Sequence, residues 1–188
     1  MRYREACAAQ VAAFFIHKAG GKLTILKLIK LMYLAERLSL ERYGEPITGD
    51  RLVSMPHGTA LSITLNHMKG LIESSPGGWD EWISDKENRE VSLADPSMMR
   101  SPEESLLALS DTDLEVINEI WDRFGHFSAS SLRNYTHSAK IPEWIDPCGS
   151  SSTITYQELF RALGFSPEKI SDLLEKLEEQ EQIDRAFA

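Results

Sequence analysis

The sequence has few cysteines: only Cys7 and Cys148 occur among its 188 residues. Neither has a second cysteine at the spacing that zinc ligands require, which excludes a cysteine-based zinc framework. Two cysteines this far apart are typical of reduced structural thiols in an intracellular protein. The sequence therefore predicts a cytoplasmic protein that carries no metal and no other cofactor.

Long hydrophobic runs are also absent. The most apolar stretch, residues 23–40, is interrupted by four charged side chains: Lys27, Lys30, Glu36 and Arg37. A membrane-spanning helix needs about 20 consecutive and mostly apolar residues, so we predict no membrane span. Residues 1–20 have neither the long apolar core nor the cleavage site of a signal peptide. Membranes are therefore not among the expected partners.

The sequence has fewer basic than acidic residues. The chain has 20 Lys and Arg against 29 Asp and Glu, which gives a formal net charge of −9. An acidic surface repels phosphate, so this composition disfavours nucleic acid as a partner. The densest basic group indicates only a solvated face near a helix start; it consists of Lys18, Lys22, Lys27 and Lys30. A basic protein partner suits the composition better, and the sequence leaves homo-oligomerisation open.

Repeats and low-complexity segments are missing as well, and helical periodicity dominates the apolar pattern. The predicted helices cover residues 4–19, 24–43, 59–69, 110–124, 128–135, 155–163 and 166–182. The second of these is bounded by Thr24 as its N-cap and Gly44 at its stop position. Because this helix is apolar on nearly every side, we expect it at the centre of the domain.

Two short strands are predicted at residues 79–84 and 90–93, on either side of a polar turn. The predicted fold class is therefore mainly α (α+β): a compact helical domain with a small two-stranded β element and a C-terminal helical pair. We place the domain at residues 1–150 and a C-terminal helical extension, packed on it, at residues 151–188.

Trp79 and Trp82 fall in the first predicted strand. Residues three apart in a strand point to opposite faces, so one tryptophan can pack while the other presents a contact surface. Tryptophan is enriched among the residues that dominate binding energy, which makes both candidates for partner binding. The alternative is that both pack beneath the hairpin.

Catalytic motifs are not found. The five histidines include no pair at helical i, i+4 spacing with a carboxylate, and no serine lies in a G-x-S-x-G elbow. An enzyme would therefore need a dispersed site in which groups such as Asp50, His57 and His137 converge in a pocket. We predict that the protein is not an enzyme.

One family resemblance is present. Residues 27–35 (KLIKLMYLA), followed by residues 43–47 (YGEPI) and Asp50, resemble the Panacea domain of SocA-like antitoxins, a family with phage-associated members. The family pattern continues to a Gly-Pro dipeptide before the next helix, and here that dipeptide is Gly58-Thr59. This departure removes the fixed geometry of proline at that point.

A second matching region lies downstream. It contains a short helix capped by Ser128, the pair Thr136-His137, and then Trp144. Residues 138–140, Ser-Ala-Lys, stand where the family usually has acidic residues. If those acidic residues contact a partner in other members, this protein must make different contacts. The resemblance covers about residues 23–144 and leaves the chain from residue 153 onward outside.

The resemblance implies an antitoxin of a prokaryotic or phage toxin–antitoxin system that neutralises a cognate toxin by direct protein–protein binding. The alternatives are a DNA-binding regulator of its own operon, a proteolytic adaptor and, less favoured, an enzyme with a dispersed site. The partner-binding candidates are Arg51, His57, Trp79, Trp82, Arg133, His137 and Trp144. The final helix, with Ile170, Leu173 and Leu177 on one face, is expected to offer that apolar stripe to a partner.

Overall fold

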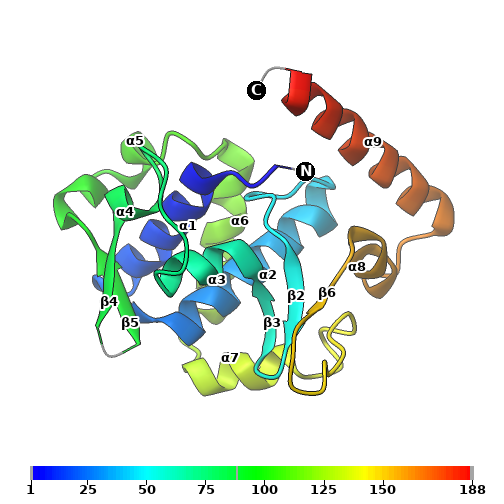
Figure 1. Cartoon of the computed structure of the whole chain (residues 1–188), viewed down its shortest axis with the longest axis horizontal. Coiled ribbons are helices and arrows are strands. Elements are labelled where there is room, and N and C mark those ends of the chain that lie inside the picture. The colour runs from blue at the N-terminus through cyan, green and yellow to red at the C-terminus, as the bar shows by residue number, and fades with distance from the viewer. Residues whose placement is uncertain (1, 88, 187–188) are drawn as a thin grey trace.

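The structure is a computed structural model that describes residues 2–87 and 89–186. It is mainly helical and contains two small sheets of three strands each (Figure 1). The predicted fold class, mainly α with some β, is confirmed. None of the described helices combines the length and the apolar character needed to span a bilayer.

Helices α1 (Glu5–Lys18) and α2 (Ile25–Tyr43) form the centre of the molecule. Residues 7–16 of α1 are buried without interruption, and so is most of α2. The Thr24 hydroxyl accepts a hydrogen bond from a backbone N–H at the start of α2, and Gly44 ends the helix in the left-handed conformation, with φ of 71°. Both boundaries match the prediction because each depends on a local capping interaction.

Two further helices cover α2. Helix α6 (Asp111–Phe124) contacts both α1 and α2, and α7 (Ala129–Thr136) contacts α2 and the second sheet. The side chains of Ser110 and Ser128 cap these helices by accepting hydrogen bonds from backbone N–H groups of the first turn. Both helices were predictable from the sequence because their start signals are local.

The two sheets are antiparallel. The first has the strand order β1 (Lys22–Thr24), β5 (Glu90–Leu93), β4 (Ile83–Glu87), and the second has the order β3 (Gly58–Leu61), β2 (Leu52–Met55), β6 (Ser152–Thr153). The predicted two-stranded element is therefore one part of a larger sheet, and the second sheet was not predicted. All of residues 58–61 are buried, so they lack the polar alternation of a half-buried strand. Helix α3 (Ser62–Met68) begins only after them, not at residue 59.

The predicted strand at residues 79–84 is wrong in its first half. Trp79–Trp82 form a helical turn, α4, and β4 begins at Ile83. The Trp79 N–H donates to the Glu5 carboxylate on α1, 2.8 Å away, which satisfies the start of this turn from a distant part of the chain. Trp79 and Trp82 are only 3% and 8% exposed, so the expectation that one of them presents a contact surface is also wrong.

The chain continues from β5 through short helical segments to the C-terminal helices. These elements are the 3₁₀ helix η1 (Pro96–Met99), α5 (Pro102–Ser105), α8 (Tyr156–Ala162) and α9 (Pro167–Ala186). Strand β6 pairs with β2, and Leu159 and Phe160 of α8 are buried. In Figure 1, α9 runs along one side of the molecule toward the N-terminus.

The apolar stripe of α9 packs on the rest of the chain. Ile170 and Leu177 are each 5% exposed, and half-buried Leu173 lies where a side chain at Gly44 would be. Lys176 pairs with Glu45 at 2.7 Å beside this contact. Ile170 and Leu177 are therefore not available to a partner, whereas Leu173 is only half-buried, and the expectation that α9 contacts a partner stays a prediction.

Candidate functional site

The two sequence regions that resemble the Panacea domain meet at one corner of the molecule. We call this cluster the motif junction. It consists of Lys30 and Tyr33 from α2, Gly58 and Thr59 from the β2–β3 hairpin, Thr136 and His137 from the end of α7, and Glu143 and Trp144 beyond it.

Lys30 joins α2 to the β2–β3 hairpin. It is 2% exposed, and its Nζ donates a hydrogen bond to the backbone carbonyl of Thr59. Burial lowers the pKa of Lys30 to about 7, because an ammonium group is poorly solvated there. Gly58, with φ of 91°, allows this approach: a Cβ at that position would lie 3.0 Å from the Lys30 Nζ.

A second buried connection joins α2 to the segment after α7. The Tyr33 hydroxyl donates to Glu143 Oε1 at 2.9 Å, and Arg37 Nε donates to the same oxygen at 2.7 Å. Burial and the neighbouring Glu143 carboxylate raise the pKa of Tyr33, so its hydroxyl keeps the proton that it donates. This pairing spans 110 residues of sequence, and no sequence signal indicated it.

Trp144 connects the same segment to β2. Its indole Nε1 donates to the backbone carbonyl of Met55 at 3.0 Å, and its ring centroid lies 4.5 Å from that of His137. The Ile145 N–H donates to Ser54 Oγ at 3.3 Å. The buried groups of the junction therefore hold α2, the hairpin and the end of α7 together.

The surface of the junction carries two histidines and an arginine. His57 is exposed, while Arg133 and His137 are half-buried. The pKa of His137 is lowered, first by burial and then by the nearby positive groups Lys30, Arg133 and His57. The structure thus brings together four of the predicted partner-binding candidates: His57, Arg133, His137 and Trp144.

The part of the chain that forms the junction matches a known family. The family model described as antitoxin SocA-like, Panacea domain, matches residues 28–145. The chain belongs to this family. The Panacea match contains every residue of the motif junction and ends immediately after Trp144. No curated protein and no solved structure gives a significant match.

The remaining candidates lie away from the Panacea motif junction. Arg51 is exposed at a separate hollow of about 310 Å³ that is also lined by Tyr3 and Tyr156. Trp79 and Trp82 belong to the α4 turn beside the first sheet. These three residues are therefore not part of the candidate site.

The Panacea turn at residues 46–50 is held by two buried carboxylates. Glu36 is 1% exposed and accepts hydrogen bonds from the N–H groups of residues 47–49. Asp50 accepts from Ile63 N–H at 2.9 Å and Thr64 N–H at 2.7 Å, at the start of α3. Asp50 thus faces α3, and the structure does not bring it together with His57 and His137.

The role of Glu36 was missed from the sequence, although a signal was present: an acid on a helix that is otherwise apolar nearly all round. In the part of the chain that the structure describes, no three His, Cys, Asp or Glu side chains are grouped so that they could hold a metal ion.

The Glu36→Gln variant should alter how stability depends on pH. Burial raises the pKa of Glu36 from 4.5 to about 7, against the hydrogen bonds from Thr48 and Gly49 that lower it. Between pH 4.5 and 7 the folded state therefore holds this proton more firmly than the unfolded state. The stabilising contribution is present below pH 4.5 and falls by about 3 kcal/mol as the pH rises to 7.

Urea unfolding of both proteins at several pH values between 4.5 and 8 measures this effect. The free energy of unfolding of the wild type minus that of Glu36→Gln should fall with rising pH. If this difference in the free energy of unfolding stays constant between pH 4.5 and 8, the pKa of Glu36 is not raised by burial. Glu178→Gln, on the exposed face of α9, is the matched control.

Proposed function

We propose that this protein neutralises a cognate toxin by direct protein–protein binding. The observation that carries the proposal is membership of the SocA-like antitoxin family through a match that encloses the whole motif junction. Hydrogen bonds from Lys30, Tyr33 and Trp144 hold α2, the hairpin and the segment after α7 in place. A rigid corner of this kind suits recognition of a partner surface, because little conformational entropy is lost on binding.

The surface over the junction has the composition of a binding patch. Trp144 is half-buried, Ile145 is 68% exposed, and Arg133 and Lys140 add positive charge. Tryptophan and arginine are enriched among residues that dominate binding energy. On a molecule with a net charge of −9, a local basic patch favours an acidic region of the partner and helps to orient it during association.

Co-expression with the product of the adjacent open reading frame tests the proposal. If that product is toxic, we expect this protein to restore growth and to co-purify with it in a stoichiometric complex. Growth rescue without a stable complex would instead favour a proteolytic adaptor or an enzymatic mechanism. Steeply salt-dependent binding to operator DNA would favour a transcriptional regulator. Absence of both toxicity and complex formation contradicts the antitoxin proposal.

The Arg133→Glu variant tests whether the motif junction contacts the partner. Reversing this charge should weaken the complex about tenfold, because a favourable charge pair is replaced by repulsion. Calorimetric titration measures the affinity, and thermal unfolding checks that stability is unchanged. Arg100→Glu makes the same change of charge beside α5, on another side of the molecule, and should leave the affinity unaltered. Equal affinities for Arg133→Glu and Arg100→Glu would mean that the motif junction is not part of the interface with the partner.

A further inference from the structure

The second sheet ends in a strand that is paired on one side only. Strand β6 forms hydrogen bonds with β2, and in the strand order β3, β2, β6 it lies at an edge of the sheet. Figure 1 shows β6 beside β2, where the chain leads into α8. Both residues of β6, Ser152 and Thr153, are exposed. This strand is therefore accessible to another chain.

The register of the β2–β6 pair shows which backbone groups are free. Thr153 lies opposite Val53, and the next residue, Ile154, donates its N–H to the Leu52 carbonyl at 2.8 Å. In an antiparallel pair the backbone groups of successive residues point alternately toward the partner strand and away from it. The N–H and C=O of Thr153 therefore point away from β2. They have no hydrogen-bond partner within the described residues, and we call them the free edge.

A hollow of about 710 Å³ lies beside the free edge, between β6, α8 and the segment after α7. We call it the β6 hollow. Ile145, which is 68% exposed, is the most accessible apolar side chain in its lining, and half-buried Pro147 and Ala162 lie near it. Ile145 also belongs to the surface proposed above to bind the partner. The β6 hollow therefore continues that surface toward the edge of the sheet.

The charged residues around the β6 hollow do not favour one sign of charge. Exposed Asp146, Glu158 and Arg161 all line it. The two carboxylates are partly engaged within the chain, since Asp146 accepts from the Cys148 N–H at 2.9 Å and Glu158 accepts from Thr155 N–H at 2.7 Å. The kind of partner is indicated instead by the free edge, because a backbone donor and acceptor on one strand match an extended chain.

We propose that an extended segment of the partner protein pairs with β6 and adds a strand to the second sheet. This inference rests on the proposed function, since it assigns a second contact to the same complex. One residue of the added segment accepts a hydrogen bond from the Thr153 N–H and donates one to the Thr153 carbonyl. Its neighbours project their side chains alternately to the two faces of the sheet. An apolar side chain on the face of the β6 hollow then packs on Ile145.

The shortness of β6 explains why both contacts are needed. An edge of two residues forms few hydrogen bonds, and short edge strands are one way in which proteins avoid pairing with unrelated chains. Only a segment that also buries Ile145 gains enough contact to bind. Strand β6 and helix α8 follow the residues that the family model matches, so this contact lies outside the shared Panacea domain.

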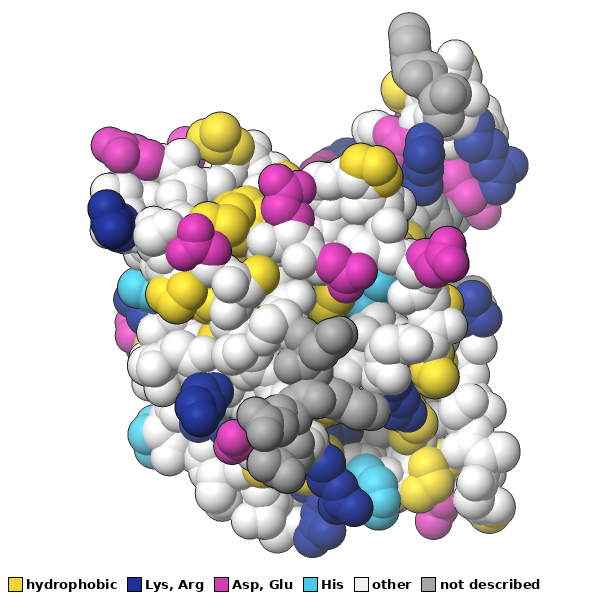
Figure 2. Space-filling model, turned by 60° about the vertical axis from the view of Figure 1, so that its left-hand side comes forward, with side chains coloured by type: hydrophobic (Ala, Val, Ile, Leu, Met, Phe, Trp, Pro, Cys, Tyr) yellow, Lys and Arg dark blue, Asp and Glu magenta, His cyan; other side chains and the backbone are white. Residues whose placement is uncertain are grey.

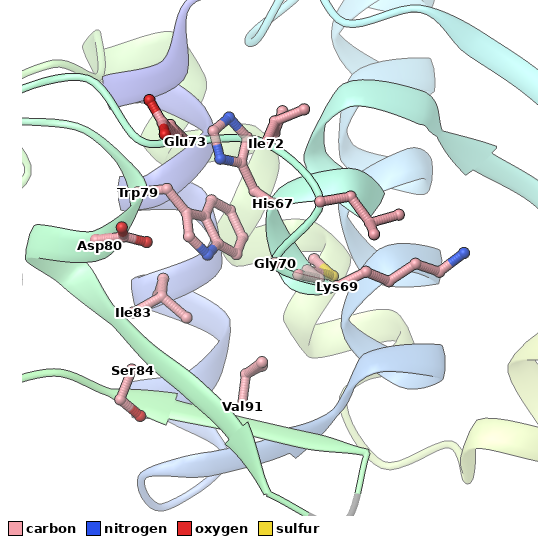
Figure 3. A pocket seen from close by; sticks show the side chains of 12 residues that line it. His67, Lys69, Gly70, Ile72, Glu73, Trp79, Asp80, Ile83, Ser84 and Val91 are labelled. Carbon is pink, nitrogen blue, oxygen red and sulfur yellow. The ribbon is translucent and has the colours of Figure 1, made fainter.

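Amide hydrogen exchange, followed by NMR, tests strand addition directly. The Thr153 N–H should exchange rapidly in the free protein and at least tenfold more slowly in the complex with the product of the adjacent open reading frame. Ile72, labelled in Figure 3 at a hollow between α3 and α4, has an amide that also lacks a hydrogen bond to any described residue. Figure 2 turns that side of the molecule forward. The exchange rate of the Ile72 amide should be the same with and without the partner.

Two substitutions at residue 153 separate backbone recognition from side-chain recognition. Thr153→Pro removes the free N–H but none of the hydrogen bonds between β2 and β6, and proline is tolerated on edge strands whose N–H faces solvent. It should weaken the complex at least tenfold. Thr153→Ala keeps the backbone groups and should bind as the wild type does. Thermal unfolding of each variant checks that the fold is retained.

A third variant tests the apolar contact and does not depend on how residue 153 tolerates proline. Ile145→Ser should weaken the complex at least tenfold. Leu71→Ser is the matched control, because Leu71 is 66% exposed and lies at the hollow between α3 and α4. It should leave the affinity unaltered.

The outcomes distinguish this inference from the proposed function. A complex in which the Thr153 amide exchanges as fast as in the free protein overturns strand addition and leaves toxin binding intact. Undiminished affinity of both Thr153→Pro and Ile145→Ser has the same meaning. If the wild type forms no complex at all, the proposed function fails, and the added strand fails with it.

Discussion

The Gly58→Ala variant is expected to lose about 3 kcal/mol or more of its free energy of unfolding. Gly58 has φ of 91°, a conformation that costs an alanine about 1–3 kcal/mol. An added Cβ would also overlap the Thr136 hydroxyl and lie 3.2 Å from His137 Cδ2. Crowding of a packed site costs about another 1–3 kcal/mol. Urea denaturation of the two proteins measures the difference.

Gly70→Ala is the matched control for this substitution. Gly70 also has positive φ, at 66°, but a Cβ added there would meet nothing within 4 Å. It should therefore show the conformational cost alone, about 1 kcal/mol. Equal losses for the two variants would mean that the close packing of Gly58 against α7 contributes nothing to stability.

The second large effect is expected at Glu143. In the Glu143→Ala variant the Tyr33 hydroxyl and the Arg37 guanidinium lose their shared acceptor inside the protein. Removal of one partner from a buried, charged hydrogen-bond network costs about 3–5 kcal/mol. We place this variant near 3 kcal/mol, because the Arg37 side chain is 16% exposed and water can solvate it in part. Chemical denaturation again gives the measurement.

Two further variants distinguish loss of the hydrogen-bond network from loss of side-chain volume at residue 143. Glu143→Gln keeps an acceptor oxygen of the same shape, so it should retain most of the stability that Glu143→Ala loses. Glu115→Ala breaks an exposed pair with Arg42 and should cost less than about 1 kcal/mol. If Glu143→Ala costs no more than Glu115→Ala, Glu143 does not hold α2 to the segment after α7.

Both large effects concern how closely α2 packs against the other segments of the motif junction. Gly58 and Glu143 lie on different segments, yet each determines how closely α2 approaches another part of the motif junction. The proposed contact surface of His57, Arg133 and Trp144 covers these buried groups. Loss of either interaction is therefore expected to impair binding through stability, whereas Arg133→Glu should impair binding alone.

Elements whose limits depend on local interactions were predictable. The Thr24 cap and the Gly44 stop of α2 involve neighbours within four residues, and so do the serine caps of α6 and α7. The family resemblance was equally local in character, since it rests on ordered short motifs along the chain. These parts of the prediction needed no knowledge of which distant segments meet.

The errors have the opposite character. Residues 58–61 become strand because β2 pairs with them, and Trp79 starts a helical turn because Glu5 accepts its N–H. In each case a partner far away in sequence overrode the local pattern.

The sequence by itself determined the helical character of the chain, the limits of its main helices, and the family to which it belongs. Only the tertiary structure decided that Lys30 and Glu143 lie buried in one junction, and that Trp79 packs against His67. The physical reason is the distance along the sequence over which each interaction acts. Helix caps and periodicity act over a few residues, whereas burial of a charged or polar side chain depends on segments that can lie 110 residues apart.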